Sequence, residues 1–241
     1  MRKNSHFSGQ PLYGQVIKLL DKSKILNFSR EKGGERYTKR FNCWIHLVVM
    51  LYAVIMRFDS LREITASLLA ETRKLAHLGI TFKIGRSTLA DANKRRPEAI
   101  FEAIYRDLYA TYRHVLSSDS RSRKTPKWMK RLQIIDSTTI TLFSNLLFKG
   151  AGRHPKTGKK KGGIKVHTVI HANEGVPSDI KFTSAATNDS FMLKPATLSK
   201  GDIMAMDRAY IDYAKFQQLT ERGVIYVTKM KKNLRYSVLS D

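Results

Sequence analysis

Apolar side chains in the first half of the chain recur every three or four residues, which is the spacing of one face of an α-helix. The clearest run contains Leu61, Ile64, Leu68, Leu75 and Leu78. Ser60 and Glu63 form a capping box ahead of this run, and Gly79 follows it as a helix stop. Ser87 opens a short basic helix, and after Pro97 a further helical run contains Ile100, Ile104, Leu108 and Val115. The pattern predicts an all-helical region over residues 1–118.

Residues 43–56 are almost entirely apolar and raise the question of a membrane span. Polar residues bound the segment, because Asn42 and His46 lie at its start and Arg57 and Asp59 lie at its end. The segment is shorter than the roughly 18 to 20 residues that a bilayer requires. We therefore expect a buried central helix and no membrane partner.

Residues 119–130 are rich in Ser, Arg and Lys and contain Pro126, which predicts a linker. Beyond it the pattern changes to short runs rich in Ile, Val and Thr, which are typical of strands. Strands are expected at 132–143, 164–171, 178–183, 202–207 and 224–230, with helices at 188–198 and 213–222. The predicted fold class is α+β, with a helical N-terminal domain at 1–118 and a mixed sheet with helices at 131–241.

The charge balance narrows the range of partners. The chain has 241 residues, of which 44 are Lys or Arg and 20 are Asp or Glu, so its formal net charge is +24. Such an excess favours a polyanionic partner, with nucleic acid ahead of a membrane surface. The single cysteine, Cys43, excludes an intramolecular disulfide and a cysteine-based zinc site. Residues 1–10 lack the apolar core of a signal peptide, so a cytoplasmic protein is expected.

Asp136 is the first candidate for chemistry. It follows Ile134 and Ile135 near the middle of a predicted strand, and it is the single acid in a strongly basic stretch, 120–173. An unpaired carboxylate is costly to bury at such a position, so a partner or a metal ion is expected. A turn cap or a nearby Arg partner explains this aspartate equally well.

Asp207 is the second candidate, because it ends the predicted strand at 202–207. An acid there can share a divalent cation with an acid on a neighbouring strand, and two carboxylates suit Mg²⁺, which prefers oxygen ligands. The alternative is that Asp207 caps the helix that follows it. Taken alone, Asp207 is better explained as a cap.

Basic side chains supply the candidate contacts to DNA phosphates. Most lie in a glycine-punctuated, lysine-rich hairpin, and the full set is Arg153, Lys156, Lys159, Lys160, Lys161, Lys165 and Arg208. No phosphate-binding loop ending in Gly-Lys-Ser/Thr occurs, so the hairpin is interpreted as a backbone contact whose affinity falls with salt. His167 and His171 share one face of a strand, but a metal role for them is disfavoured.

Five segments resemble the DDE transposases of bacterial insertion sequences, in the branch whose third acid lies in a Tyr-Arg-Glu-Lys motif. Residues 134–139, Ile-Ile-Asp-Ser-Thr-Thr, resemble the strand that carries the first acid, and 206–210, Met-Asp-Arg-Ala-Tyr, resemble the segment of the second acid. The segments 41–44, 60–64 and 86–93 are similar to the helical domain that precedes the core. The resemblance implies a ribonuclease H-like core at 131–241 and a DNA-binding helical domain at 1–118.

The resemblance also implies a reaction and its cofactor. In this family a phosphodiester is hydrolysed at the transposon end, and the freed 3′ hydroxyl then attacks target DNA. Two Mg²⁺ ions, for which Mn²⁺ can substitute, would be held by three acids, among them Asp136 and Asp207. The segment of the third acid, a Glu, is absent from residues 1–241, and Glu221 is a poor substitute. The resemblance therefore implies a core that lacks its C-terminal part.

Two classes of function remain open at the level of sequence. The first is a metal-dependent transposase that cuts and joins double-stranded DNA. The second is a truncated, catalytically inactive transposase that binds transposon ends, alone or with intact copies. An unrelated basic RNA-binding protein is a third class, and it would not bring Asp136 and Asp207 together. The expected location is the cytoplasm, at the nucleoid, and a homodimer is compatible with the sequence.

Overall fold

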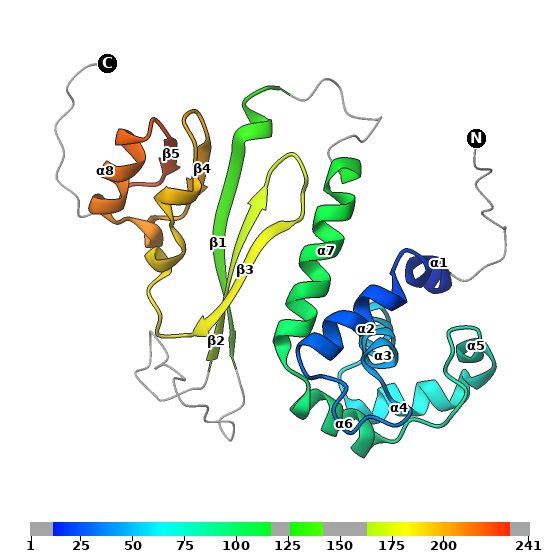
Figure 1. Ribbon diagram of the computed structural model, residues 1–241. Helices are drawn as coiled ribbons and strands as arrows, with labels where there is room; N and C mark the ends of the chain where they lie inside the picture. Colours follow the sequence, from blue (N-terminus) through cyan, green and yellow to red (C-terminus); the bar gives the residue numbers. More distant parts are fainter. Residues whose placement is uncertain (1–11, 117–125, 142–162, 232–241) are drawn as a thin grey trace, which may run out of the picture. The chain divides into compact units, whose positions relative to one another are not determined.

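The computed structural model describes residues 12–116, 126–141 and 163–231 (Figure 1). The chain divides into two compact units, Met1–Thr111 and Tyr112–Asp241. The first unit is helical and the second contains a β-sheet. Helix α7 (Glu98–Leu116) spans the division.

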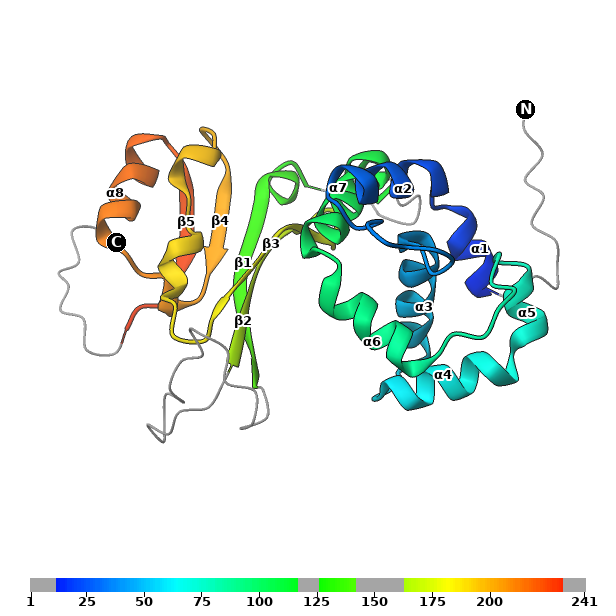
Figure 2. The ribbon, with the colours of Figure 1, turned by 60° about the horizontal axis from the view of Figure 1, so that its bottom comes forward.

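The helical unit packs its helices around one apolar core. Besides most of α7, its helices are α1 (Leu12–Lys18), α2 (Lys22–Glu31), α3 (Cys43–Met56), α4 (Leu61–Ala70), α5 (Thr72–Ala76) and α6 (Arg86–Arg95). Figure 2 shows α3 lying among the other helices of this unit. The core includes the fully buried Cys43, Leu89 and Ile100.

Helix α3 is the buried central helix that the sequence predicts. The Asn42 side chain accepts a hydrogen bond from the Ile45 N–H at its start, and Arg57 ends it in the left-handed conformation. No single helix in the described residues is long and apolar enough to cross a membrane. The pair α3 and α4 passes that test only when taken together, and the two helices are bent by 100° at their junction.

The capping box before α4 is present in a modified form. The Ser60 hydroxyl accepts from the Glu63 N–H at 3.2 Å, and Glu63 Oε2 accepts from the Asp59 N–H at 2.9 Å, one residue before the usual partner. The apolar run after Ser60 forms two helices instead of one, because Glu71 ends α4 and α5 follows. Both helices still contribute to the core.

The second unit contains a five-stranded mixed sheet. Its strands are β1 (Leu132–Thr141), β2 (Gly163–His171), β3 (Pro177–Ser184), β4 (Ile203–Met206) and β5 (Ile225–Thr228), in the order β3-β2-β1-β4-β5. The pairs β1–β2 and β2–β3 are antiparallel, whereas β1–β4 and β4–β5 are parallel. This order and these directions are those of a ribonuclease H-like sheet, which confirms the predicted fold class.

The prediction of a helix at 188–198 is wrong. The structure has two short 3₁₀ turns there, η2 (Asp189–Met192) and η3 (Pro195–Thr197). Pro195 explains the difference, because proline has no N–H to donate and disfavours helical backbone at the residue before it. The later helix is present as α8 (Tyr213–Glu221).

The two faces of the sheet differ. Ile135 and Met206 pair across β1 and β4 and are buried, together with side chains from η2 and α8. Ile134 pairs with Ala205, which pairs with Val227, and Ile134 and Val227 are 39% and 56% exposed. Since side chains alternate along a strand, the hydrophobic core of this unit covers one face.

Candidate active site

The two predicted acids lie at neighbouring positions in the sheet. Asp136 belongs to β1, and Asp207 is the first residue after β4. The two strands are parallel, and their last registered pair is Ile135 with Met206. Asp136 and Asp207 are therefore the next positions along adjacent strands, and alternation places them opposite the buried face. The fold brings together two carboxylates that are 71 residues apart in the sequence.

The expectation that Asp136 is a buried carboxylate in need of a partner is wrong. Both Asp136 and Asp207 are exposed, so no buried charge demands a partner at either position. Asp136 Oδ1 accepts a hydrogen bond from the Ser137 N–H at 2.7 Å. Asp207 Oδ1 accepts from the Arg208 N–H and caps the 3₁₀ turn η4 (Arg208–Tyr210), which is the capping role weighed for it. One oxygen of each carboxylate lies outside these bonds.

Tyr210 lies in the core of the sheet unit, where the charges of both aspartates influence it. Its side chain is 1% exposed, and its hydroxyl lies beside Ser137 without hydrogen-bond geometry to any described group. Burial raises the pKa of Tyr210 to about 12, and the charges of Asp189, Asp136 and Asp207 act in the same direction. The phenol is therefore neutral at physiological pH, and three carboxylates lie within electrostatic reach of it.

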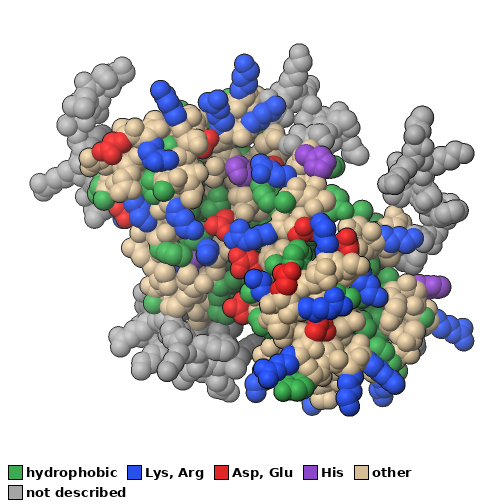
Figure 3. All heavy atoms as spheres, viewed as in Figure 1, with side chains coloured by type: hydrophobic (Ala, Val, Ile, Leu, Met, Phe, Trp, Pro, Cys, Tyr) green, Lys and Arg blue, Asp and Glu red, His purple; other side chains and the backbone are tan. Residues whose placement is uncertain are grey.

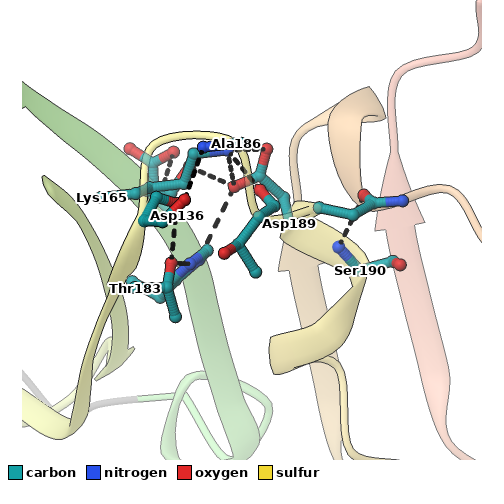
Figure 4. A network of polar contacts seen from close by, with 11 residues as sticks. Asp136, Lys165, Thr183, Ala186, Asp189 and Ser190 are labelled. Carbon is teal, nitrogen blue, oxygen red and sulfur yellow. Dashed lines mark hydrogen bonds and ion pairs between the residues drawn. The ribbon is translucent and has the colours of Figure 1, made fainter. Parts of the chain in front are cut away.

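A polar network supports the strand that carries Asp136 (Figure 4). The Ser137 hydroxyl donates to Asp189 Oδ1 at 2.7 Å, and the Lys165 ammonium contacts the same carboxylate at 3.2 Å. Lys165 also donates to the Thr187 carbonyl at 2.8 Å. The Lys165 and Asp189 side chains are 13% and 15% exposed, so the ion pair is shielded from water on most sides. The network joins β1, β2 and η2.

His167 belongs to this network. Its ring is fully buried, with Nε2 at 2.7 Å from Thr183 Oγ1 and Nδ1 at 3.6 Å from Asp189 Oδ1. Burial lowers the pKa of His167, which the Asp189 carboxylate partly offsets. Phe191 packs edge-on against the ring. His167 is therefore a neutral core histidine.

The structure describes two of the seven basic residues that were expected to contact DNA, Arg208 and Lys165, and it places them differently. Arg208 is exposed beside Asp207. Lys165 points into the network described above, and this geometry argues against a phosphate contact for it. The remaining five lie outside the described residues: Arg153, Lys156, Lys159, Lys160 and Lys161. Figure 3 shows that other Lys and Arg side chains project from both units.

Asp136 and Asp207 supply some, but not all, of the ligands that a divalent cation needs. Two exposed carboxylates on adjacent strands present oxygen ligands, which Mg²⁺ prefers. Among the described residues, no three His, Cys, Asp or Glu side chains are grouped to enclose a metal ion. Asp136 and Asp207 would therefore hold an ion whose other ligands include water or phosphate oxygens.

Sequence analysis missed Asp189 and the partnership of Ser137 with it. The two residues are 52 positions apart, and Asp189 lies in a polar stretch that carries no strand signal. The Asn188-Asp189-Ser190 run resembles an ordinary cap, and Asn188 does cap η2. Only the folded sheet shows that Asp189 reaches Ser137.

Comparison with known proteins identifies the class to which this chain belongs. Residues 127–239 match the family described as "Transposase DDE domain", and residues 8–81 match a domain of unknown function. The chain is 29% identical over 155 residues to "Putative transposase y4zB" of Sinorhizobium fredii, which covers 64% of this chain and 40% of that protein. Residues 127–239 belong to the transposase DDE family, and the curated relatives support a DDE transposase of bacterial insertion sequences.

The chain is also similar to a second curated transposase and to one solved structure. The chain is 23% identical over 159 residues to "Probable transposase for insertion sequence element IS5377" of Geobacillus stearothermophilus, covering 66% of this chain and 40% of that protein. Among solved structures it is similar to the piggyBac transposase synaptic complex with hairpin DNA, with TM-score 0.45 and 11% identity over 92% of this chain and 52% of that chain. The matched region spans about two fifths of the curated relatives.

Proposed function

We propose that this chain binds double-stranded DNA at transposon ends and contributes Asp136 and Asp207 to a metal-dependent phosphodiester cleavage site. The family to which it belongs generally uses divalent metal ions. Mg²⁺ is the expected ion, with Mn²⁺ as a substitute, because the candidate ligands are carboxylates. The net charge of +24 supports a polyanionic substrate. A homodimer and action at the nucleoid in the cytoplasm are part of this proposal.

The observation that carries the proposal is the register of β1 and β4. It places Asp136 and Asp207 at neighbouring positions on an exposed part of the sheet, where a DNA backbone can reach them. Bound divalent ions would activate an attacking oxygen and stabilise a leaving oxygen. The aspartates would orient the site, with each already held on one oxygen by a backbone N–H.

The supporting residues would act by positioning. Ser137 follows Asp136 directly, and its hydroxyl is held by Asp189, which is itself fixed by Lys165. Tyr210 is a neutral phenol within electrostatic reach of both aspartates. These contacts would restrict the backbone around Asp136 and thereby limit the directions in which its carboxylate can point.

The test uses the 241-residue chain, labelled DNA carrying the terminal repeats of its element, and Mg²⁺ or Mn²⁺. Cleavage that disappears in Asp136→Asn and in Asp207→Asn supports the proposal. Loss of Mn²⁺-dependent thermal stabilisation in the same variants is a second readout, since an ion at 100 times its Kd stabilises the fold by about 2.7 kcal/mol. Cleavage that is unchanged in both variants would overturn it.

The alternative function is a binding module without cleavage. It is favoured by one observation, namely that the described residues bring two acids together and no third. Under this alternative the chain shifts transposon-end DNA, Mn²⁺ gives no cleavage, and Asp136→Asn binds DNA as the unaltered chain does. The same experiment therefore separates the two functions.

A further inference from the structure

We propose that a basic groove on the helical unit binds the phosphate backbone of double-stranded DNA. The groove has a volume of about 960 Å³ and lies between the loop at 33–41 and helix α6. This inference rests on the proposed function in its choice of DNA as the polyanion. It assigns a binding site to a unit whose matched family, at residues 8–81, has no described function.

The charge of the groove has a single sign. Of the residues that the structure describes, no Asp or Glu lines the groove. Six cationic side chains do, namely Arg36, Lys39, Arg40, Lys83, Arg95 and Arg96. Within the described residues, no ion pair joins Arg36, Lys39, Arg40 or Lys83 to an acid, and all four residues are exposed. These four ammonium and guanidinium groups are therefore available to a ligand.

Two acids close in sequence to the groove are already engaged, Glu35 in the interior and Asp91 with Arg95 of the groove wall. Glu35 Oε1 accepts from the Ser29 hydroxyl at 2.8 Å and from the Cys43 N–H at 2.7 Å, so its carboxylate faces the interior. Asp91 pairs with Arg95 one turn along α6. Because neither carboxylate lines the groove, the local field remains positive.

The loop that forms one wall is held in place before any ligand binds. A Cβ at Gly34 would lie 2.3 Å from Ile100 Cδ1 and 2.7 Å from Ser29 Oγ, so the backbone lies directly against the core. Arg96 donates to the Phe41 carbonyl, and its guanidinium lies 5.4 Å from the centre of the Phe41 ring. A loop fixed in this way loses little conformational entropy on binding.

Tyr37 adds a feature typical of a binding loop. Its backbone is left-handed, with φ of 60°, and its side chain is 81% exposed. The Arg36 guanidinium lies 5.2 Å from the centre of its ring. A non-glycine residue in this conformation is strained, and such strain is concentrated at functional sites. The ring and guanidinium together offer a flat surface to a sugar or a base.

The form of the groove favours a polymer over a small anion. Its cations are spread over a loop and a helix instead of converging on one point, and Thr38 and Thr88 add hydroxyl donors between them. Gly85 is the N-cap of helix α6, and no side chain caps the first N–H groups of the helix. Duplex DNA carries one negative charge per about 1.7 Å of axis, which suits a row of spaced cations.

The test compares two triple variants with equal loss of charge. The groove variant is Arg36→Gln, Lys39→Gln and Arg40→Gln. The matched control is Lys22→Gln, Arg62→Gln and Arg73→Gln, which are exposed cations of the same unit outside the groove. Fluorescence anisotropy with a 30-base-pair duplex of mixed sequence is measured from 50 to 200 mM KCl. Circular dichroism checks that both variants fold.

The groove variant is expected to lose on the order of 100-fold in affinity at 0.1 M salt, and its salt slope should fall by about 2.7, since each lost phosphate contact removes about 0.9. The control should stay within about threefold of the unaltered chain. Equal weakening of both variants would overturn the inference, as would tighter binding of duplex RNA than of duplex DNA. Metal-dependent cleavage is scored separately, so failure of the Asp136 and Asp207 site leaves this result readable.

Discussion

The helical unit and the sheet unit place their polar groups in different ways. The helical unit surrounds its core with helices, and among the described residues its buried polar side chains are Ser29 and His46. The sheet unit has its core on one face and buries His167 within a network of charged partners. In the first unit the proposed contacts are surface cations separate from the core. In the second, the residues around Asp136 are also structural, so function and stability are coupled there.

The largest expected effect concerns the sheet unit. Asp136→Asn should reduce metal-dependent cleavage by more than about 100-fold, because even residues that support a metal ligand typically cost 10- to 100-fold. DNA affinity should change by less than about threefold, since the proposed groove belongs to the other unit. Anisotropy and a nicking assay on one preparation test both. A parallel loss of binding would contradict the separation of roles.

Shortening a buried side chain of the helical unit should cost more stability than shortening an exposed side chain of the sheet. Leu89 is fully buried in the helical unit, so Leu89→Ala should lower its free energy of unfolding by about 2 to 5 kcal/mol. Val227 is 56% exposed on the sheet, and Val227→Ala should cost less than about 0.5 kcal/mol. Urea unfolding followed by circular dichroism measures both. Similar costs would show that the sheet face is covered in solution.

Acid should weaken the helical unit through His46. Burial lowers the pKa of His46 to about 4, and the Asn93 side chain, 2.6 Å from its Nε2, only partly offsets this. The unfolded ring binds a proton near pH 6.5 and the folded ring near pH 4, so stability falls as the pH drops through this interval. The expected loss is about 3 kcal/mol.

The variant His46→Gln keeps a donor for Asn93 and removes the titrating ring. Its stability should therefore change less between pH 7 and pH 4 than that of the unaltered chain. Chemical unfolding at several pH values supplies the comparison. Identical pH dependence in both proteins would exclude His46 as the source.

The smallest expected difference in stability between the two units comes from breaking one ion pair in each. Asp189→Asn leaves Lys165 largely buried without its charged partner and should cost about 2 kcal/mol. Asp107→Asn breaks the pair with Lys24, whose side chain is 52% exposed, and should cost less than about 1 kcal/mol. Thermal unfolding of each variant gives the two values. If Asp107→Asn were the costlier change, the contrast between the units would be wrong.

Much of the fold could be predicted from residue patterns because the pattern and the local geometry agree. Strands β1 and β2 lie where Ile, Val and Thr are frequent, and helix α3 lies where Asn42 caps an apolar run. The failure at 188–198 has a local cause in Pro195, which outweighed the helical spacing around it.

The candidate sites were predictable only in part. Asp136 could be found because it follows an apolar pair within a strand, and Asp207 because it directly follows a strand. The burial argument for Asp136 was wrong, and the roles of both aspartates stay predictions. The link from Ser137 to Asp189 depends on strand pairing and a distant turn, which no local pattern encodes. The groove likewise arises when the loop at 33–41 folds against α6, although its cations are visible in the sequence.

Cys43 has a practical consequence. It is the one cysteine of the chain, it is fully buried in α3, and burial raises the pKa of its thiol. A thiol-modifying reagent can therefore react with it only when the helical unit opens, and the sheet unit contributes no background. The rate of labelling would report local unfolding of one unit alone, without any engineered probe.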